Sequence, residues 1–104
     1  MNMLKEITTE EEYQQLLAQG VIPIDVRSQS EIEEGKIPQA AVGYDWNSGE
    51  FHDNFDQLDP EKAYLFICRS GNRSMQACLF LQSQGFDKVY NLKGGMMNWQ
   101  GAVE

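Results

Sequence analysis

The stretch "AYLFICRSGNRSMQACLFLQSQG", residues 63–85, joins an apolar run to a helical pattern through a short polar loop. Residues 63–68 are apolar on both alternating faces, which is typical of a central strand covered by helices on both sides. Residues 74–85 predict a helix of about three turns, with Ser74 as its N-cap and Gly85 at its end. In parallel α/β sheets the binding crevice lies at the carboxyl ends of the strands, and Cys68 stands at one such end.

The rest of the chain alternates strands with helices. We expect strands at 21–26, 40–44 and 88–92, and helices at 9–20, 28–35, 47–60 and 94–100. The first of these helices begins with a capping box of Thr9 and Glu12. This order predicts an α/β fold with a mostly parallel central sheet and helices on both faces. The length suits a single domain spanning residues 1–104.

The composition excludes several classes of partner. With 16 acidic and 8 basic residues, the chain carries a formal net charge of -8, which repels nucleic acids and anionic membranes. Apolar segments fall far short of the roughly 20 residues that span a bilayer. The first residues turn acidic where a signal peptide would be apolar, so we expect a cytoplasmic protein.

The two cysteines and the one histidine do not suggest a metal site or a disulfide. Cys68 and Cys78 belong to one strand, loop and helix segment, and a reducing compartment disfavours a bond between them. Two thiols and one imidazole fall short of a zinc site, so we expect no metal and no cofactor. Cys78 lies among apolar helix positions, which favours a structural role over that of a resolving thiol. His52 is distant in sequence from Cys68, which favours a surface role over that of a catalytic base.

The loop after Cys68 has the composition of an anion site. So tight a connection turns backbone N–H groups toward the sulfur at the positive end of the next helix. Gly71 suits a position that needs an unusual backbone conformation, and Asn72 tolerates the left-handed region. Buried cysteine remains the alternative, since free Cys is often buried. The loop residues that we expect to bind an anion are Arg69, Ser70, Gly71, Asn72 and Arg73.

Thiol activation alone is a small effect in such a loop. Lowering a thiol pKa from about 8.5 to about 6.5 raises the thiolate fraction roughly 25-fold at pH 7. Nucleophilicity falls roughly 8-fold over the same two units, so the net gain is about 3-fold. The loop should therefore act mainly by binding an anionic substrate and stabilising charge on it or on a modified sulfur.

Three stretches resemble the single-domain rhodaneses, a family of sulfurtransferases. Residues 25–40, "DVRSQSEIEEGKIPQA", are similar to the family's first signature, and residues 68–74, "CRSGNRS", to its active-site loop. Residues 85–99, "GFDKVYNLKGGMMNW", resemble its closing pattern. Lys36 and Gln39 depart from the first signature, which commonly reads Gly-His-Ile-Pro-Gly.

The resemblance implies a twisted parallel sheet and a double displacement. The Cys68 thiolate would take sulfane sulfur from an anionic donor such as thiosulfate or a persulfide and form a Cys persulfide. That sulfur would then pass to cyanide, a thiol or a protein acceptor. Arg69 and Arg73 would bring positive charge near the donor. The resemblance implies that Asp25, Arg27 and Glu31 form a supporting ion-pair network and that Gly94 and Gly95 allow close backbone packing near the loop. Met96 and Met97 suit either packing or the rim of the site.

Two other functions remain open. A cysteine phosphatase or arsenate reductase would need Cys-x5-Arg, but Arg73 follows Cys68 with only four residues between. A binding or sensing module without turnover would keep the fold but would not need the nucleophile. The acidic surface also leaves room for a protein sulfur donor or acceptor.

Overall fold

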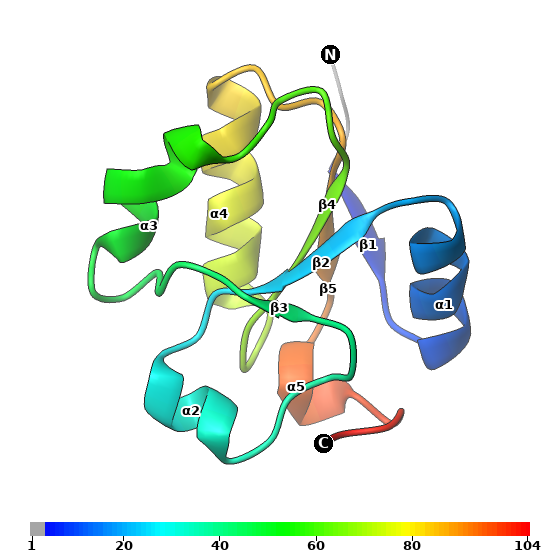
Figure 1. Cartoon of the computed structure of the whole chain (residues 1–104). Coiled ribbons are helices and arrows are strands. Elements are labelled where there is room, and N and C mark those ends of the chain that lie inside the picture. Colours follow the sequence, from blue (N-terminus) through cyan, green and yellow to red (C-terminus); the bar gives the residue numbers. More distant parts are fainter. Residues whose placement is uncertain (1–3) are drawn as a thin grey trace.

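The computed structural model describes residues 4–104, which build one five-stranded sheet between helices (Figure 1). The strands are β1 (Lys5–Ile7), β2 (Ile22–Asp25), β3 (Ala41–Val42), β4 (Tyr64–Ile67) and β5 (Val89–Leu92). Their order across the sheet is β1-β5-β4-β2-β3, and every pair is parallel. The fold class expected from the sequence is confirmed.

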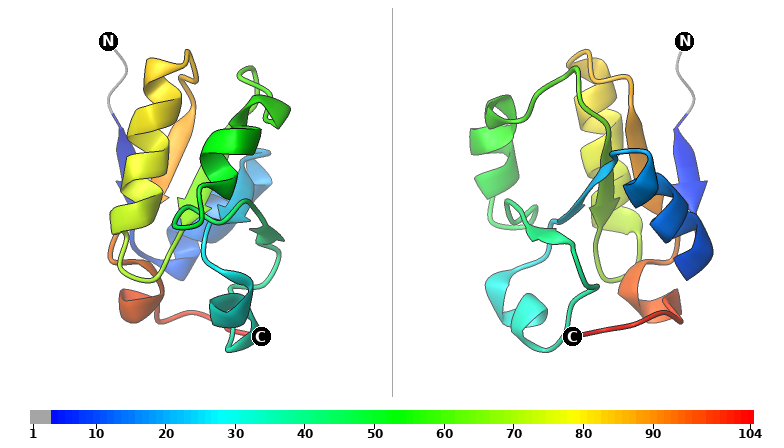
Figure 2. Two further views of the ribbon diagram at one scale, coloured as in Figure 1. Left: turned by 90° about the vertical axis from the view of Figure 1, so that its left-hand side faces the viewer. Right: turned by 45° about the vertical axis from the view of Figure 1, so that its right-hand side comes forward.

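The helices are α1 (Glu10–Ala18), α2 (Gln29–Glu33), α3 (Glu50–Asn54), α4 (Asn72–Ser83) and α5 (Gly95–Asn98), with a 3-10 turn, η1 (Phe55–Gln57), after α3. Figure 2 shows α3 and α4 on one side of the sheet and α1 on the other. None of the helices within residues 4–104 is long and apolar enough to cross a membrane.

The strand β4 lies at the centre because both of its faces are apolar and fully covered. All four of its residues are buried. Tyr64 and Phe66 pack into the core beneath α3 and α4, whereas Leu65 and Ile67 pack into the core beneath α1. Alternate residues of a strand point to opposite faces, so one short strand supports both layers.

Two expectations about the loop and its helix were wrong. The helix α4 begins at Asn72, two residues earlier than expected, and its N-cap is Gly71 in the left-handed conformation with φ 92°. Asn72 is therefore helical, and Gly71 takes the unusual backbone conformation expected of it, but Ser74 lies buried in the first turn instead of capping it. The connection is tighter than the sequence suggested, because glycine opens the helix without any side-chain cap.

The edge strand β1 was not expected from the sequence. It pairs in parallel with β5, with Ile7 opposite Leu92. Only Ile7 of its three residues is buried, so Lys5 and Glu6 give it no apolar pattern. The expected helix in 47–60 also proved to be two shorter pieces, α3 and η1.

Candidate active site

The sulfur of Cys68 lies at the carboxyl end of β4, beside the first turn of α4. The N–H of Gly71 points at Sγ from 3.1 Å and the N–H of Ser74 from 3.3 Å. The Ser74 hydroxyl is also 3.3 Å from the same sulfur. Cys68 itself has no exposed surface. The two N–H donors directed at this sulfur form a site that stabilises negative charge there.

Two glycines let the backbone close around this sulfur. A Cβ on Gly71 would stand 2.8 Å from the N of Gly94, and φ 92° would strain any other residue. A Cβ on Gly95 would stand 2.4 Å from the carbonyl O of Cys68 and 2.6 Å from the carbonyl of Arg69. The turn into α5 therefore packs directly against the Cys68 loop, and the N–H groups of Met96 and Met97 donate to the Cys68 and Arg69 carbonyls at 2.9 Å.

A buried polar chain supports the loop from below. The Ser74 hydroxyl donates to Oδ1 of Asn91 on β5, and Asn91 is buried. The Asn91 amide group donates in turn to the Gly71 carbonyl at 3.2 Å and to the Glu6 carboxylate at 2.9 Å. Because Nδ2 serves two acceptors, Oδ1 is left to face Ser74. Asn91 thus holds both the loop carbonyl and the hydroxyl next to the sulfur.

Arg73 is held by an acidic partner from another element. Its guanidinium donates to both carboxylate oxygens of Glu31 on α2, at 2.8 Å each. These hydrogen bonds with Arg73 lower the pKa of Glu31 to about 2, despite partial burial. The same pair raises the pKa of Arg73. Much of the Arg73 charge is therefore balanced within the protein.

Asp25 and Arg27 form a second, buried ion pair at the end of β2. The guanidinium of Arg27 lies 2.8 Å from the Asp25 carboxylate, and it donates to the carbonyls of Gly35 and Glu31. The expected network of Asp25, Arg27 and Glu31 therefore needs a correction: the Glu31 carboxylate pairs with Arg73, and only its backbone oxygen contacts Arg27. The reason is reach, since α2 turns the Glu31 side chain toward α4.

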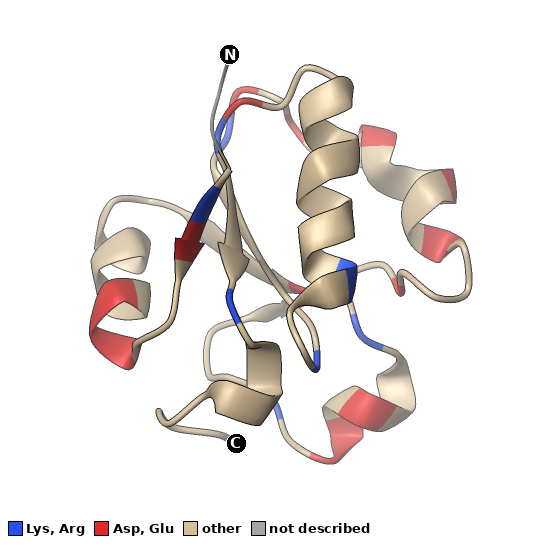
Figure 3. Cartoon of the chain, turned by 180° about the vertical axis from the view of Figure 1, so that it is seen from behind, with Lys and Arg blue, Asp and Glu red and all other residues tan. Residues whose placement is uncertain are grey.

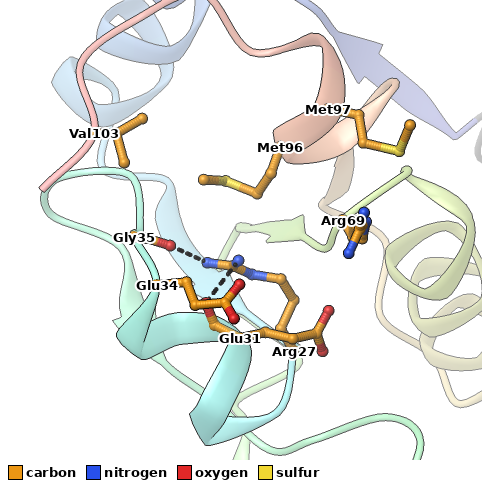
Figure 4. A pocket seen from close by; sticks show the side chains of 8 residues that line it. All are labelled: Arg27, Glu31, Glu34, Gly35, Arg69, Met96, Met97 and Val103. Carbon is orange, nitrogen blue, oxygen red and sulfur yellow. Dashed lines mark hydrogen bonds between the residues drawn. The ribbon is translucent and has the colours of Figure 1, made fainter.

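A cavity of about 300 Å³ opens beside this loop (Figure 4). Basic positions gather beneath the start of α4, and acidic positions mark α1 and α2 (Figure 3). Met96 and Met97 line the cavity from α5. Met96 also packs against the core beneath α1, so it combines the packing and rim roles weighed from the sequence, whereas the exposed Met97 lies at the rim. Arg69 forms no ion pair among residues 4–104. The lining residues are Arg27, Glu31, Glu34, Gly35, Arg69, Met96, Met97 and Val103.

Cys78 and His52 lie away from this cavity. Cys78 is buried in the core beneath α4, and its thiol donates to the Tyr90 carbonyl at 3.3 Å. Burial raises the pKa of this thiol strongly. The His52 ring packs against Trp46 and Phe80, at 4.5 and 4.9 Å between ring centroids. Both cysteines are free, and no group of three His, Cys, Asp or Glu side chains within residues 4–104 could hold a metal ion.

Comparison with known proteins identifies the family. A family model for the Rhodanese-like domain matches residues 9–102. The chain belongs to the rhodanese-like family. It is 43% identical over 102 residues to "Putative sulfurtransferase YtwF" of Bacillus subtilis (strain 168), covering 97% of this chain and 95% of that protein. It is 34% identical over 90 residues to "Thiosulfate sulfurtransferase GlpE" of Pseudomonas syringae pv. syringae (strain B728a), covering 86% of this chain and 82% of that protein.

A solved structure agrees with this assignment. The rhodanese-like domain protein from Staphylococcus aureus superimposes with a TM-score of 0.79 at 30% identity, covering 97% of both chains. Relatives named sulfurtransferases support sulfurtransferase activity, in general terms, for this rhodanese-like chain.

Sequence reasoning missed two residues of the site. Ser74 was expected to cap a helix and Asn91 only to continue a strand, yet both belong to the polar chain under Cys68. The available signal was Asn91 itself, a polar residue in an otherwise apolar strand, which needs a hydrogen-bonding partner when buried.

Proposed function

We propose that this protein is a sulfurtransferase that carries sulfane sulfur as a persulfide on Cys68. The thiolate attacks the outer sulfur of an anionic donor such as thiosulfate, and the S–S bond of the donor breaks. Sulfite leaves with the bonding electron pair, and Cys68 keeps the transferred sulfur as Cys–S–S⁻. A thiophilic acceptor such as cyanide, a thiol or a protein thiol then attacks that outer sulfur and restores the thiolate.

One observation carries this proposal: the N–H groups of Gly71 and Ser74 converge on Cys68 Sγ. Fixed N–H donors of this kind stabilise the negative charge of the Cys68 thiolate. The N–H groups of Arg69 to Arg73 would hold the outer sulfur once it is formed, and Arg69 would attract the donor.

Access to the sulfur requires a local movement. Cys68 has no exposed surface, so a donor reaches Sγ only when part of the surrounding loop gives way. Arg69 and Ser70 are exposed and lie directly after Cys68, so this is the segment proposed to move, with loss of the hydrogen bond from the Met97 N–H to the Arg69 carbonyl. The cavity lined by Arg69 and Met96 lies beside this segment and would receive the donor.

Arg73 argues against phosphatase or arsenate reductase chemistry. Those enzymes close their loop on a tetrahedral oxyanion with a bidentate Arg. Here both arms of the Arg73 guanidinium are occupied by Glu31. A small loop around one sulfur suits sulfur transfer better than phosphoryl transfer.

Intact-protein mass spectrometry after incubation with thiosulfate tests the proposal. We expect a gain of one sulfur, lost in Cys68→Ser, kept in Cys78→Ser, and removed by cyanide as thiocyanate. Absence of any gain with thiosulfate and with an organic persulfide would favour the binding or sensing module. Hydrolysis of an aryl phosphate would favour the phosphatase.

A further inference from the structure

Val103 forms part of the wall of the cavity beside the Cys68 loop. Val103 lines this cavity, and its Cγ1 would stand 3.0 Å from a Cβ placed on Gly35 (Figure 4). Val103 therefore lies directly beside Gly35, which follows α2, at the edge of the pocket in which the donor is proposed to bind.

Hydrogen bonds on both sides of Val103 fix its position. Ala102 donates its N–H to the Glu10 carboxylate at 3.0 Å and accepts from the Trp99 indole at 2.9 Å. Glu104 exchanges two backbone hydrogen bonds with Lys36, at 2.8 and 3.0 Å. A side chain held between two such anchors presents the same surface to every ligand.

Lys36, one of the departures from the family signature, is the residue that secures this wall. Its ammonium lies 2.9 Å from the Glu104 carboxylate and donates to the Ala40 and Ile37 carbonyls at 3.1 and 3.4 Å. These contacts join Glu104 to the segment that follows α2. Lys36 acts through Val103 and does not itself line the cavity.

The cavity is apolar on the side that Val103 shares with α5. Val103 and Met97 keep 54% and 68% of their surface exposed, although large apolar side chains usually gain by burial. Met96 lines the same side, partly buried. Three apolar side chains around one cavity would contact an organic group.

The charges in the cavity suit a donor with one negative charge. Arg27 is paired with Asp25, and Glu31 is paired with Arg73. Arg69 and Glu34 form no ion pair among residues 4–104. One unpaired cation beside one unpaired carboxylate favours a single anionic group over a dianion such as thiosulfate.

We infer that Val103, positioned by Lys36, is a specificity-determining residue that favours monoanionic donors carrying an apolar organic group, such as organic thiosulfonates. This inference rests on the sulfurtransferase function proposed above. The Cys68 thiolate attacks the outer sulfur of R–SO₂–S⁻, the S–S bond breaks, and the sulfinate R–SO₂⁻ leaves with the electron pair. The product on the enzyme is the same Cys68 persulfide.

Steady-state kinetics with benzenethiosulfonate and with thiosulfate, each with cyanide as acceptor, tests the inference through thiocyanate formation. The wild type should have the higher kcat/KM with benzenethiosulfonate. Val103→Ser should lower the ratio of the two kcat/KM values by roughly three- to tenfold, mainly through KM for the organic donor. Val42→Ser is the matched control, because Val42 is also 54% exposed but lies on β3, and it should keep the wild-type ratio.

The role of Lys36 is tested by the same ratio. Lys36→Met should lower it, and Lys36→Arg, which can still pair with Glu104, should restore most of it. The inference is overturned if the wild-type kcat/KM with benzenethiosulfonate is equal to or lower than that with thiosulfate, or if Val103→Ser leaves the ratio of the two values unchanged. In either case, turnover of thiosulfate still upholds the proposed function. Failure of the wild type with both donors overturns both proposals together.

Discussion

The carboxylate of Glu31 holds the guanidinium of Arg73 through two parallel hydrogen bonds of 2.8 Å. Glu31 and Arg73 are 42 positions apart, and their pairing joins α2 to the first turn of α4, which follows the Cys68 loop. The same carboxylate also accepts from the Ser28 backbone and completes the capping box of α2. One acidic side chain thus fixes a helix end and an arginine of the loop.

Glu31→Gln should lower the free energy of unfolding at pH 7 by about 1 kcal/mol, because a neutral amide cannot match the bidentate carboxylate. Glu33→Gln, which changes an exposed carboxylate on the same helix, should have a smaller effect. The pKa of Glu31 is about 2 in the folded protein, below its ordinary value of 4.5. The contribution is therefore present above pH 4.5 and is lost as the pH falls toward 2.

Urea unfolding of wild type and Glu31→Gln at a series of pH values measures this dependence. The difference between the two proteins should shrink as the pH falls from 4.5 toward 2. A difference that stays constant over this range would show that the charge of Glu31 does not contribute to stability.

Gly95→Ala should disrupt the Cys68 loop far more than Gly85→Ala disrupts the end of α4. Both glycines have positive φ, 58° and 92°, so alanine is strained at both positions by about 1 kcal/mol. A Cβ at Gly85 meets nothing within 4 Å, but at Gly95 it meets the Cys68 carbonyl O at 2.4 Å. Overlap with backbone should add roughly 1–3 kcal/mol.

Unfolding measurements on both variants isolate the effect of this overlap, because the backbone strain is common to them. Persulfide formation should be lost or strongly slowed only in Gly95→Ala, since the loop must shift to make room. Equal destabilisation of the two variants would refute the close packing of α5 on the loop.

The sequence predicted the parts of the fold that depend on apolar runs and on caps. The capping box of Thr9 and Glu12 is present at α1, and Gly85 follows the end of α4 as expected. Pro23 is part of the strand β2 despite its missing N–H. The strand pairs along its whole length with β4, whereas on its other side β3 pairs only with Ile24 and Asp25 and leaves Pro23 without a partner strand there. A missing N–H is tolerated where the neighbouring strand is short.

The rest of the site depended on tertiary contacts that leave no local pattern. Cys68 and its loop follow from a strand end and a helix start, which are close in sequence. The partner of Arg73 is Glu31, and the partner of Ser74 is Asn91, 17 positions away on a strand. Such pairings depend on which elements are neighbours in the sheet, and hydrophobic periodicity does not specify them.

Cys78 should remain unmodified in the folded protein. The thiol is buried under α4 and its pKa is strongly raised, so hardly any thiolate is available to react with an alkylating reagent. In a Cys68→Ser variant, intact mass should show no alkylation under native conditions and complete alkylation in denaturant. Rapid native alkylation would instead support the role of a resolving thiol.

Ser74 and Asn91 should be energetically coupled. Ser74→Ala leaves the buried Oδ1 of Asn91 without its donor and should cost about 1–3 kcal/mol. Asn91→Leu removes that acceptor but also the donor to the Gly71 carbonyl, so it should cost at least as much. The double variant should be less destabilised than the sum of the two, by roughly 0.5–3 kcal/mol, because neither partner is then left unpaired.

Ser83→Ala is the control for this coupling. It removes an exposed hydroxyl that donates to the Phe80 carbonyl at the other end of α4, and it should show no coupling to Asn91→Leu. Urea unfolding of the four proteins of each cycle gives the coupling, and strict additivity of Ser74→Ala with Asn91→Leu would contradict the polar chain beneath Cys68.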